Sequence, residues 1–302
     1  MNETNFGAID IGSNAVRILV KSIEKQEDNM EHLVQKTLYR FPLRLGEDSF
    51  SEGKISKQKT QHLICLMKAF KQILKIYDVV DFRACATSAM RDAENGKQVV
   101  EQIRKETKIN VEIIKGTEEA GLIYNTHIER LFDQHKNYLY IDVGGGSTQL
   151  TLIHNGEPVF SHSFNIGTVR LMKNKVSDQE KANFSTKLTE LYAAHPDIIV
   201  VGAGGNINKL YKLTKTKASK ETILVKNLQS LHQKLSSLSV EQRMNQYKLK
   251  RERAEVIAYA SDILLEVAKL TDIQQIIVPT ISIGDGIIKK MYEKHKKKNS
   301  LP

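Results

Sequence analysis

One stretch of the sequence decides the fold, and it reads Tyr138-Leu139-Tyr140-Ile141-Asp142-Val143-Gly144. An apolar run that carries one aspartate and ends on glycine indicates a strand that leads into a turn. The same pattern stands near the N-terminus as Ala8-Ile9-Asp10-Ile11-Gly12. A second apolar run follows each copy, at residues 15–20 and at residues 150–153. The chain therefore contains two strand–turn–strand units of the same design, one in each half.

Around these hairpins the pattern alternates between helices and strands. Helices are predicted over residues 56–79, 99–108, 117–131 and 250–270 and from residue 287, and strands over 81–87, 110–114, 198–200 and 275–279. Alternation of this kind implies an α/β architecture, and the repeated hairpin implies two similar lobes with a cleft between them. We divide the chain into an N-terminal lobe, 1–121, and a C-terminal lobe, 122–302. The final helix, 287–302, is a candidate to complete the N-terminal lobe.

Composition excludes several classes of protein. Of the 302 residues, 40% are hydrophobic and 26% are charged, the balance of a folded globular protein rather than a disordered one. No apolar run approaches the roughly 18 residues of a membrane span, and the N-terminus lacks the pattern of a signal peptide. Two cysteines, Cys65 and Cys85, make neither a disulfide framework nor a metal site, and we expect both to be buried thiols. These absences predict a cytoplasmic protein with no membrane partner.

The charge balance favours an anionic partner. Lysine and arginine number 45 against 35 acidic residues, and the net charge of +10 attracts anions over long range. Two lysine clusters contribute much of this positive charge. The first comprises Lys209, Lys212, Lys215, Lys217 and Lys220. The second comprises Lys289, Lys290, Lys294, Lys296, Lys297 and Lys298. The alternative is that these lysines are ordinary solvated positions. The chain has no tryptophan and does not interleave aromatic with basic residues, so no specific nucleic acid is expected as a partner.

The second hairpin turn carries the strongest signal for a ligand, because it reads Gly144-Gly145-Gly146-Ser147-Thr148. Glycines let the backbone approach a ligand closely, and successive N–H groups in such a turn bind anions. Ser147 and Thr148 add hydroxyl donors. A tight turn without a ligand is the alternative, but the matching turn after Asp10, with Gly12, Ser13 and Asn14, favours phosphate binding.

Two familiar phosphate motifs do not fit. Residues 7–13 have the glycine spacing of a P-loop, but Ser13 stands where that motif needs lysine. A dinucleotide fingerprint needs a helix directly after the glycines, whereas residues 148–153 read as a strand. The turns are therefore hairpins.

Two such hairpins, one in each lobe, would bind a polyanion from both sides. Asp10 and Asp142 would be acceptors in a site rich in donors, and their expected role is to hold Mg²⁺ or another divalent cation, directly or through water. A third loop, Val201-Gly202-Ala203-Gly204-Gly205-Asn206, follows an apolar strand. We expect its backbone, at Gly204 and Gly205, to pass close to a nucleotide or a phosphate chain.

Two further stretches have alternative interpretations. The sequence Thr87-Ser88-Ala89-Met90-Arg91 follows a strand, and hydroxyls followed by arginine suit a loop that contacts phosphate. Arg91 could equally pair with Asp92 or Glu94 at the surface. Glu118 and Glu119 stand in a first helical turn, where acids are normal partners of the helix dipole. If they face the cleft, one of them could position a water for attack on phosphorus.

Taken in order, these motifs resemble those of the exopolyphosphatase/guanosine pentaphosphate phosphohydrolase (Ppx/GppA) family, within the superfamily of actin, sugar kinases and heat-shock chaperone ATPases. The matching segments lie at residues 8–14, 86–93, 116–120, 141–148, 201–205 and 253–257. They occur in the family's order and extend over the chain from end to end. The resemblance implies two actin-like (ribonuclease H-like) lobes in the short, two-domain form, and hydrolysis of terminal phosphoanhydrides.

The resemblance also implies roles for individual residues. It assigns catalysis to Glu119 with Arg91, a further basic position to Arg17, and metal binding to Asp142, for which Asp10 is the counterpart in the first hairpin. The expected phosphate-binding residues are Gly12, Ser13, Asn14, Arg17, Thr87, Ser88, Gly144, Gly145, Gly146, Ser147, Thr148, Gly204 and Gly205.

Three positions depart from the family's pattern. Gln149 stands where the family commonly has glutamate after Ser-Thr, which removes a negative charge near the expected metal. Gly121 and Gly284 stand where arginines are usual. Two missing arginines suggest a narrower or weaker channel for polyphosphate.

The leading interpretation is a metal-dependent exopolyphosphatase, in which a water positioned by Glu119 attacks the terminal phosphorus of inorganic polyphosphate. Guanosine pentaphosphate is the second candidate substrate, and an ATPase or kinase is the alternative from the superfamily. From another class, the chain could be a non-catalytic sensor that binds guanosine tetra- or pentaphosphate or polyphosphate. A homodimer is the expected assembly.

Overall fold

The computed structural model of the chain describes residues 4–25, 31–124, 133, 135–215, 221–279 and 282–299. The chain forms two compact units, Met1–Thr126 with Ile283–Pro302 and His127–Ser282, which we call unit 1 and unit 2. It therefore passes from unit 1 into unit 2 and returns to unit 1 with its last helix. Each unit is built on one mixed sheet.

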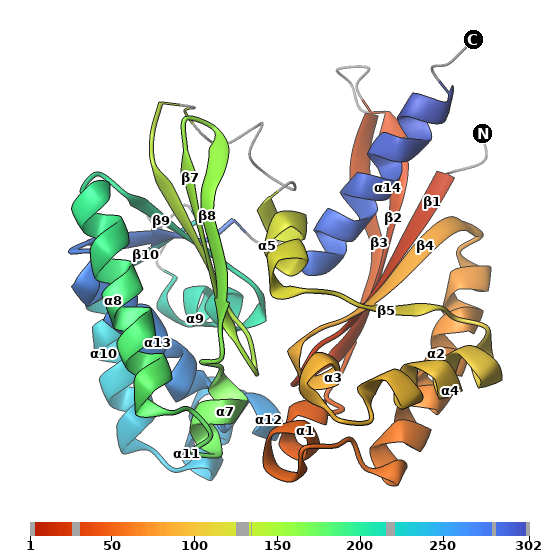
Figure 1. The fold of residues 1–302 in the computed structure, drawn as a ribbon, viewed down its shortest axis with the longest axis horizontal. Coiled ribbons are helices and arrows are strands. Elements are labelled where there is room, and N and C mark those ends of the chain that lie inside the picture. The colour runs from red at the N-terminus through yellow and green to blue at the C-terminus, as the bar shows by residue number, and fades with distance from the viewer. Residues whose placement is uncertain are drawn as a thin grey trace. The chain divides into compact units, whose positions relative to one another are not determined.

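The strands of unit 1 are β1 Thr4–Ile11, β2 Val16–Lys25, β3 Glu31–Phe41, β4 Val79–Ala86 and β5 Val111–Ile113. They form a sheet in the order β3-β2-β1-β4-β5 (Figure 1). β1 pairs antiparallel with β2, and β2 pairs antiparallel with β3, whereas β1, β4 and β5 run parallel. The first predicted hairpin is therefore β1–β2, with the sequence Gly12-Ser13-Asn14 in its turn.

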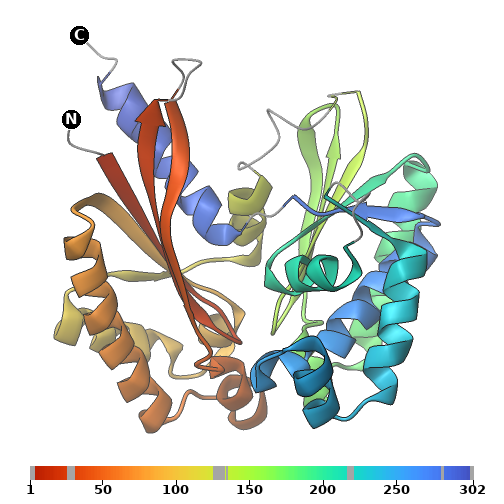
Figure 2. The same cartoon turned by 180° about the vertical axis from the view of Figure 1, so that it is seen from behind.

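The helices of unit 1 are α1 Leu45–Glu52, α2 Lys57–Ile76, α3 Ser88–Asp92, α4 Gly96–Thr107, α5 Gly116–Tyr124 and α14 Ile283–Asn299. α14 lies along the strands of this unit, against β1 and α5, as both ribbon views show (Figures 1 and 2). It begins at Ile283, before the residue 287 expected from the sequence. The last helix of the chain thus packs on the sheet formed by the first part of the chain.

Helix α2 shows how the apolar pattern selects one face. Leu63, Ile64 and Met67 are buried, as the helical period predicts. Cys65 is exposed and Cys85 is buried, so the expectation of two buried thiols is wrong for Cys65. A helix turns by about 100° per residue, which carries position 65 out of the buried row although its sequence neighbours are apolar.

The strands of unit 2 are β6 Tyr138–Val143, β7 Thr148–His154, β8 Glu157–Phe164, β9 Ile199–Ala203, β10 Thr222–Leu224 and β11 Gln275–Ile277. They form a sheet in the order β10-β11-β9-β6-β7-β8. The strands β6, β7 and β8 form an antiparallel meander, and β9 and β11 continue the sheet parallel to β6. The strands β6, β7, β8, β9 and β11 therefore repeat the order and directions of the five strands of unit 1. This repeat confirms the predicted duplication, the α/β class and the two actin-like (ribonuclease H-like) lobes.

The helices of unit 2 are α7 Thr168–Met172, α8 Asp178–Ala194, α9 Gly205–Thr214, α10 Val225–Ser237, α11 Val240–Tyr247, α12 Arg251–Ala254 and α13 Ile257–Leu270. α13 packs against α8, α9 and α10. The single helix expected over 250–270 is two helices, because the N–H of Val256 bonds to the carbonyl of Arg253 only three residues back and so closes α12. Throughout the described parts of the chain, no helix is long and apolar enough to cross a membrane.

Candidate functional site

The turn between β1 and β2 is closed by a hydrogen bond of 3.1 Å from the N–H of Gly12 to the carbonyl of Ala15. Asp10 and Arg17 are cross-strand partners beside it. Nη1 of Arg17 donates to Oδ2 of Asp10 at 2.6 Å. Oδ1 of Asp10 is buried and has no hydrogen-bond partner among the described residues. Arg17 therefore compensates the charge at one oxygen of this carboxylate, and the other oxygen is buried without a hydrogen bond among the described residues.

Two hydroxyl groups tie this turn to the end of β4. Oγ of Ser13 and Oγ of Ser88 lie 2.8 Å apart, and both residues are buried. The N–H of Thr87 donates to the carbonyl of Ile11 at 3.1 Å, which fixes the start of α3 beside the hairpin. Three of the predicted phosphate ligands, Ser13, Thr87 and Ser88, are thus neighbours in unit 1.

Arg91 of α3 lies beside Glu119 of α5. Nη1 of Arg91 is 3.8 Å from Oε2 of Glu119, and it donates to the carbonyl of Ile114 at 2.9 Å. Nε of Arg91 is 3.8 Å from Oδ1 of Asp92, so the surface pairing left open by the sequence is present as well. Glu119 is only 7% exposed, and a buried carboxylate is costly unless a cation compensates it. Arg91 supplies that cation.

The neighbouring acid, Glu118, points to a different partner. Nη2 of Arg83 on β4 lies 2.7 Å from Oε1 of Glu118 and 2.6 Å from Oε2 of Glu112 on β5. The hydrogen bonds to Glu112 and Glu118 raise the pKa of Arg83, and the bond to Arg83 lowers the pKa of Glu112. Glu118 is therefore held at the sheet by Arg83, while Glu119 is turned inward toward Arg91.

The glycine turn of unit 2 is held through its carbonyl groups. The N–H of Gly144 donates to the carbonyl of Ser147 at 2.9 Å and closes the turn. The N–H groups of Thr168 and Val169, at the start of α7, donate to the carbonyls of Gly144 and Gly145. Because the carbonyls and the N–H of Gly144 are used in this way, the remaining N–H groups of the turn are what it offers to an anion.

Two more contacts complete the support of this turn. Nε of Arg170 donates to the carbonyl of Gly146 at 2.6 Å. Oγ1 of Thr148 donates to the carbonyl of Ile166 at 2.6 Å, and Thr148 is fully buried. The hydroxyl of Thr148, expected to bind phosphate, therefore donates its proton within the protein.

The loop after β9 meets the second hairpin at Asp142. Gly204 has a φ of 89°, and its missing Cβ would overlap Oδ1 of Asp142, so only glycine fits here. Nδ2 of Asn206 donates to the carbonyl of Val143 at 2.7 Å. Nη1 of Arg253 donates to the carbonyl of Gly205. The predicted residues Asp142, Gly204 and Gly205 are thus brought together in unit 2.

Positive charge gathers beside this loop. Burial, with the neighbouring charges of Arg253 and Lys212, lowers the pKa of Lys209 on α9. Lys217 and Lys220 of the same predicted cluster lie outside the described residues. In the other cluster, on α14, Lys296 lies 3.4 Å from Glu31 and Lys289 lies 3.9 Å from Glu293, as ordinary surface lysines do.

Sequence reasoning missed two arginines that hold the loops of unit 2. Arg170 follows Gly167 in a stretch without a recognisable motif, and Arg253 stood in a matching segment but had no role assigned. Each donates to a loop carbonyl far away in the sequence, at Gly146 and at Gly205. No local signal could have identified them, because their partners are set by the fold.

Comparison with known proteins decides the family. A model of the Ppx/GppA phosphatase family matches residues 22–295, nearly the whole chain. The chain belongs to the Ppx/GppA phosphatase family.

Relatives of this Ppx/GppA chain include exopolyphosphatases. Exopolyphosphatase 1 of Mycobacterium tuberculosis is 29% identical over 204 residues, which cover 66% of this chain and 58% of that protein, less than two thirds of its length. Exopolyphosphatase 1 of Mycobacterium leprae is 24% identical over 304 residues, which cover 94% of this chain and 88% of that protein. The crystal structure of an exopolyphosphatase from Cytophaga hutchinsonii has a TM-score of 0.82 at 22% identity, over 96% of this chain and 98% of that one. The structural likeness shows a common fold.

A site for the divalent cation expected of a Ppx/GppA phosphatase depends on the oxygen atoms that the side chains offer. Within the described ranges, no group of three or more His, Cys, Asp or Glu side chains could hold a metal ion. Mg²⁺ commonly takes one or two protein carboxylates and completes its shell with water and phosphate oxygens. Asp142 and Gln149 are cross-strand partners, and the buried Oε1 of Gln149 has no hydrogen-bond partner in the described structure. These two residues fit such an ion in unit 2, and Asp10 offers a further oxygen in unit 1.

Proposed function

We propose that the chain is an exopolyphosphatase, which removes the terminal phosphate of inorganic polyphosphate by attack of a water that Glu119 orients. Of two adjacent acids in α5, Glu118 is bound by Arg83, whereas Glu119 is buried with Arg91 at 3.8 Å. A buried carboxylate beside an arginine suits a water-positioning group in phosphoryl transfer.

The proposed roles follow from the groups in each unit. Glu119 accepts a proton from the water as its oxygen bonds to the terminal phosphorus, and the P–O bond to the remaining chain breaks. Arg91 stabilises the charge on the phosphoryl oxygens. A divalent cation, for which Mg²⁺ is our proposal, would neutralise phosphate charge beside Asp142 and Gln149. The proposed setting is the cytoplasm, and the proposed assembly is a homodimer.

Guanosine pentaphosphate is the second candidate substrate. It is favoured by the positive charge of Lys209, Lys212 and Arg253 beside the loop at Gly204 and Gly205. A sensor without catalysis is disfavoured, since binding alone does not need Glu119 buried next to Arg91.

Phosphate release from long-chain polyphosphate, guanosine pentaphosphate and ATP, measured side by side with Mg²⁺, tests the proposal. Among the three substrates we expect the highest kcat/KM for polyphosphate. The variant Glu119→Gln, purified in the same way, is the control, because phosphate release that persists in it reveals a contaminating phosphatase. The highest kcat/KM for guanosine pentaphosphate would select the second candidate. A preference for ATP would replace the proposal with an ATPase. Binding of polyphosphate without release of phosphate would establish a sensor.

A further inference from the structure

The turn that carries Ser13 and Asn14 is held from outside by the start of α1. The N–H of Arg44 donates to the carbonyl of Asn14 at 3.1 Å, and the N–H of Gly46 donates to the carbonyl of Ser13 at 2.8 Å. A Cβ on Gly46 would lie 3.0 Å from the Cβ of Ser13, so the helix backbone is in close contact with the turn. The position of Ser13, whose hydroxyl faces Ser88, therefore depends on where α1 begins.

Arg44 starts α1 in a conformation that it does not favour by itself. Its φ of 54° and ψ of 46° lie in the left-handed region, and its side chain makes no capping hydrogen bond. Residues other than glycine avoid this region because their Cβ crowds the following carbonyl. Such a conformation persists where surrounding contacts enforce it. The start of α1 therefore needs a contact from another element.

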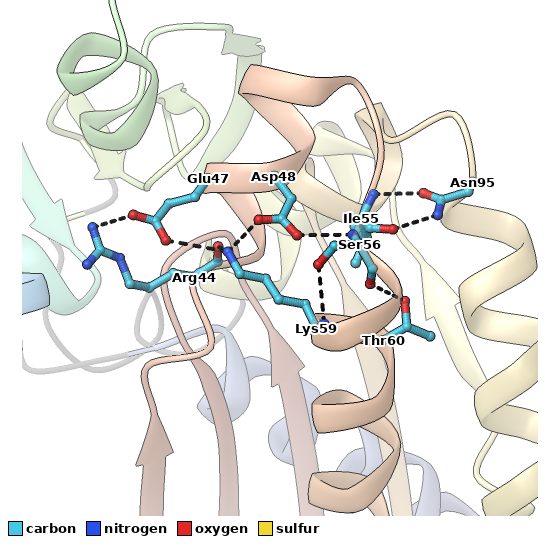
Figure 3. A network of polar contacts seen from close by, with 8 residues as sticks. All are labelled: Arg44, Glu47, Asp48, Ile55, Ser56, Lys59, Thr60 and Asn95. Carbon is cyan, nitrogen blue, oxygen red and sulfur yellow. Dashed lines mark hydrogen bonds and ion pairs between the residues drawn. The ribbon is translucent and has the colours of Figure 1, made fainter.

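Lys59 of α2 makes that contact (Figure 3). Its Nζ donates to the carbonyl of Arg44 at 2.6 Å, and it lies 2.7 Å from Oδ1 of Asp48 and 3.4 Å from Oε2 of Glu47. The ammonium group thus has three acceptors, one at the N-cap of α1 and two in its first turn, and the side chain is only 19% exposed. A cation in the first turn of α2 is disfavoured by that helix's own dipole, so the benefit of Lys59 lies in its contacts with α1.

The start of α2, which carries Lys59, is itself fixed by hydrogen bonds to other elements. Oδ2 of Asp48 accepts from the N–H of Ser56 at 3.0 Å, and Oγ of Ser56 caps α2. Asn95 exchanges two hydrogen bonds with the backbone of Ile55, of 2.9 and 2.8 Å. Figure 3 shows these residues as one continuous network with Lys59. The network joins the start of α2 to α1 and to the start of α4, which gives the ammonium group a defined place.

We propose that Lys59 is a positioning residue for phosphate binding. Its ammonium group fixes the carbonyl of Arg44, and the N–H groups of Arg44 and Gly46 then set the place of the turn at Ser13 and Asn14. This inference rests on the proposed function, because it takes the turn to contact a phosphate of the substrate. Lys59 itself does not touch the substrate.

Hydrogen exchange tests the structural step. Lys59→Met keeps the length of the side chain and removes its three donors. Lys71→Met is the matched control, because Lys71 on the same helix donates to the carbonyl of Thr107 at 2.8 Å, a contact with α4 and not with α1. We expect faster exchange in Lys59→Met for peptides covering residues 12–16 and 43–48, and no change there in Lys71→Met. Equal exchange in the two variants would overturn the proposal.

Kinetics test the functional step. We expect Lys59→Met to lower kcat/KM for polyphosphate by roughly tenfold. A displacement of ~1 Å in a group that positions the substrate can lower the rate by up to about 10²-fold. Lys71→Met, which loses its contact with Thr107 and keeps those of Lys59 with Arg44, Glu47 and Asp48, should match the wild type. Lys59→Arg keeps a donor and should recover most of the loss. An unchanged kcat/KM in Lys59→Met, despite faster exchange, would overturn the positioning role.

A failure of the proposed function would look different. The wild type would then release no phosphate from any of the substrates tested. The comparison of hydrogen exchange between Lys59→Met and Lys71→Met can still be made in that case. The affinity for inorganic triphosphate, measured by calorimetry, then replaces the kinetic measurement. Weaker binding to Lys59→Met than to Lys71→Met supports the positioning role, and equal binding overturns it.

Discussion

Asp142 on β6 and Gln149 on β7 are cross-strand partners, so their side chains leave the sheet on the same face. The carboxylate of Asp142 also fills the space that a Cβ of Gly204 would need. The hairpin positions Asp142 and Gln149 and the distant Gly204 therefore meet at one corner of unit 2. An ion bound at this corner meets one carboxylate and one amide, and thus one negative charge fewer than a pair of acids would provide.

Gln149→Glu should for this reason tighten the apparent binding of Mg²⁺, since carboxylate oxygens are preferred ligands of this ion. The measurement is phosphate release against Mg²⁺ concentration, and we expect half-saturation at a lower concentration. Gln179→Glu, which adds the same charge on the exposed face of α8, is the control and should leave the titration unchanged. Half-saturation at the same or a higher concentration in Gln149→Glu would falsify a place for this side chain at the metal.

Lys209 and Lys212 should add affinity for long polyphosphate. The double change to Gln is expected to raise KM for long chains and to flatten its dependence on salt, because salt screens the attraction between lysine and phosphate charges over ~8–10 Å near physiological ionic strength. The kcat should stay nearly constant, since these contacts are the same in the ground state and the transition state. Lys181→Gln with Lys187→Gln removes equal charge from α8 and serves as control. Identical KM values in the two double variants at every salt concentration would show that Lys209 and Lys212 only keep the protein soluble.

Two helical glycines of unit 1 should respond in opposite ways to alanine. No atom of the described structure lies within 4 Å of a Cβ built on Gly121, so Gly121→Ala should raise the free energy of unfolding by about 0.5–1 kcal/mol. A Cβ on Gly286 would overlap the carbonyl of Leu122, so Gly286→Ala should lower that free energy by about 1–3 kcal/mol. Denaturant titration of both variants measures the difference. Equal effects would contradict the close crossing of α14 and α5.

The two thiols should differ in reactivity. Burial raises the pKa of Cys85 to about 12, so this residue carries almost no thiolate at neutral or mildly alkaline pH. Cys65 is exposed on α2. Iodoacetamide applied to the native protein at about pH 8 should therefore label Cys65 and spare Cys85, as peptide mass spectrometry can establish. Labelling of Cys85 at the rate seen in denatured protein would contradict its burial.

Much of the fold was predictable because its signals are local. Each strand–Asp–turn–strand pattern, at Asp10 and at Asp142, specifies a hairpin without help from the rest of the chain. The glycine spacing after Asp142 likewise indicates an anion-binding turn. Repetition of these patterns was enough to predict two lobes of one design.

The parts that could not be predicted depend on distant partners. Both Glu118 and Glu119 suit the first turn of a helix, and the choice between them is made by Arg83, 35 residues before Glu118. The break between α12 and α13 contains neither glycine nor proline, so no local signal marks it. Arg253 is separated by 48 residues from Gly205, whose carbonyl it holds. Propensity and periodicity carry no information about such contacts.

The role of Glu119 is tested by the turnover of Glu119→Gln compared with that of Glu118→Gln. We expect Glu119→Gln to lower kcat for polyphosphate by ~10²–10⁴-fold, the range for a positioned acid or base. The affinity of Glu119→Gln for the substrate should be unchanged or higher, because this substitution removes a negative charge next to bound phosphate. Glu118→Gln, which only weakens a contact with Arg83, should retain most of the activity. Equal losses of kcat in the two variants would contradict the assignment of Glu119 as the group that orients the water.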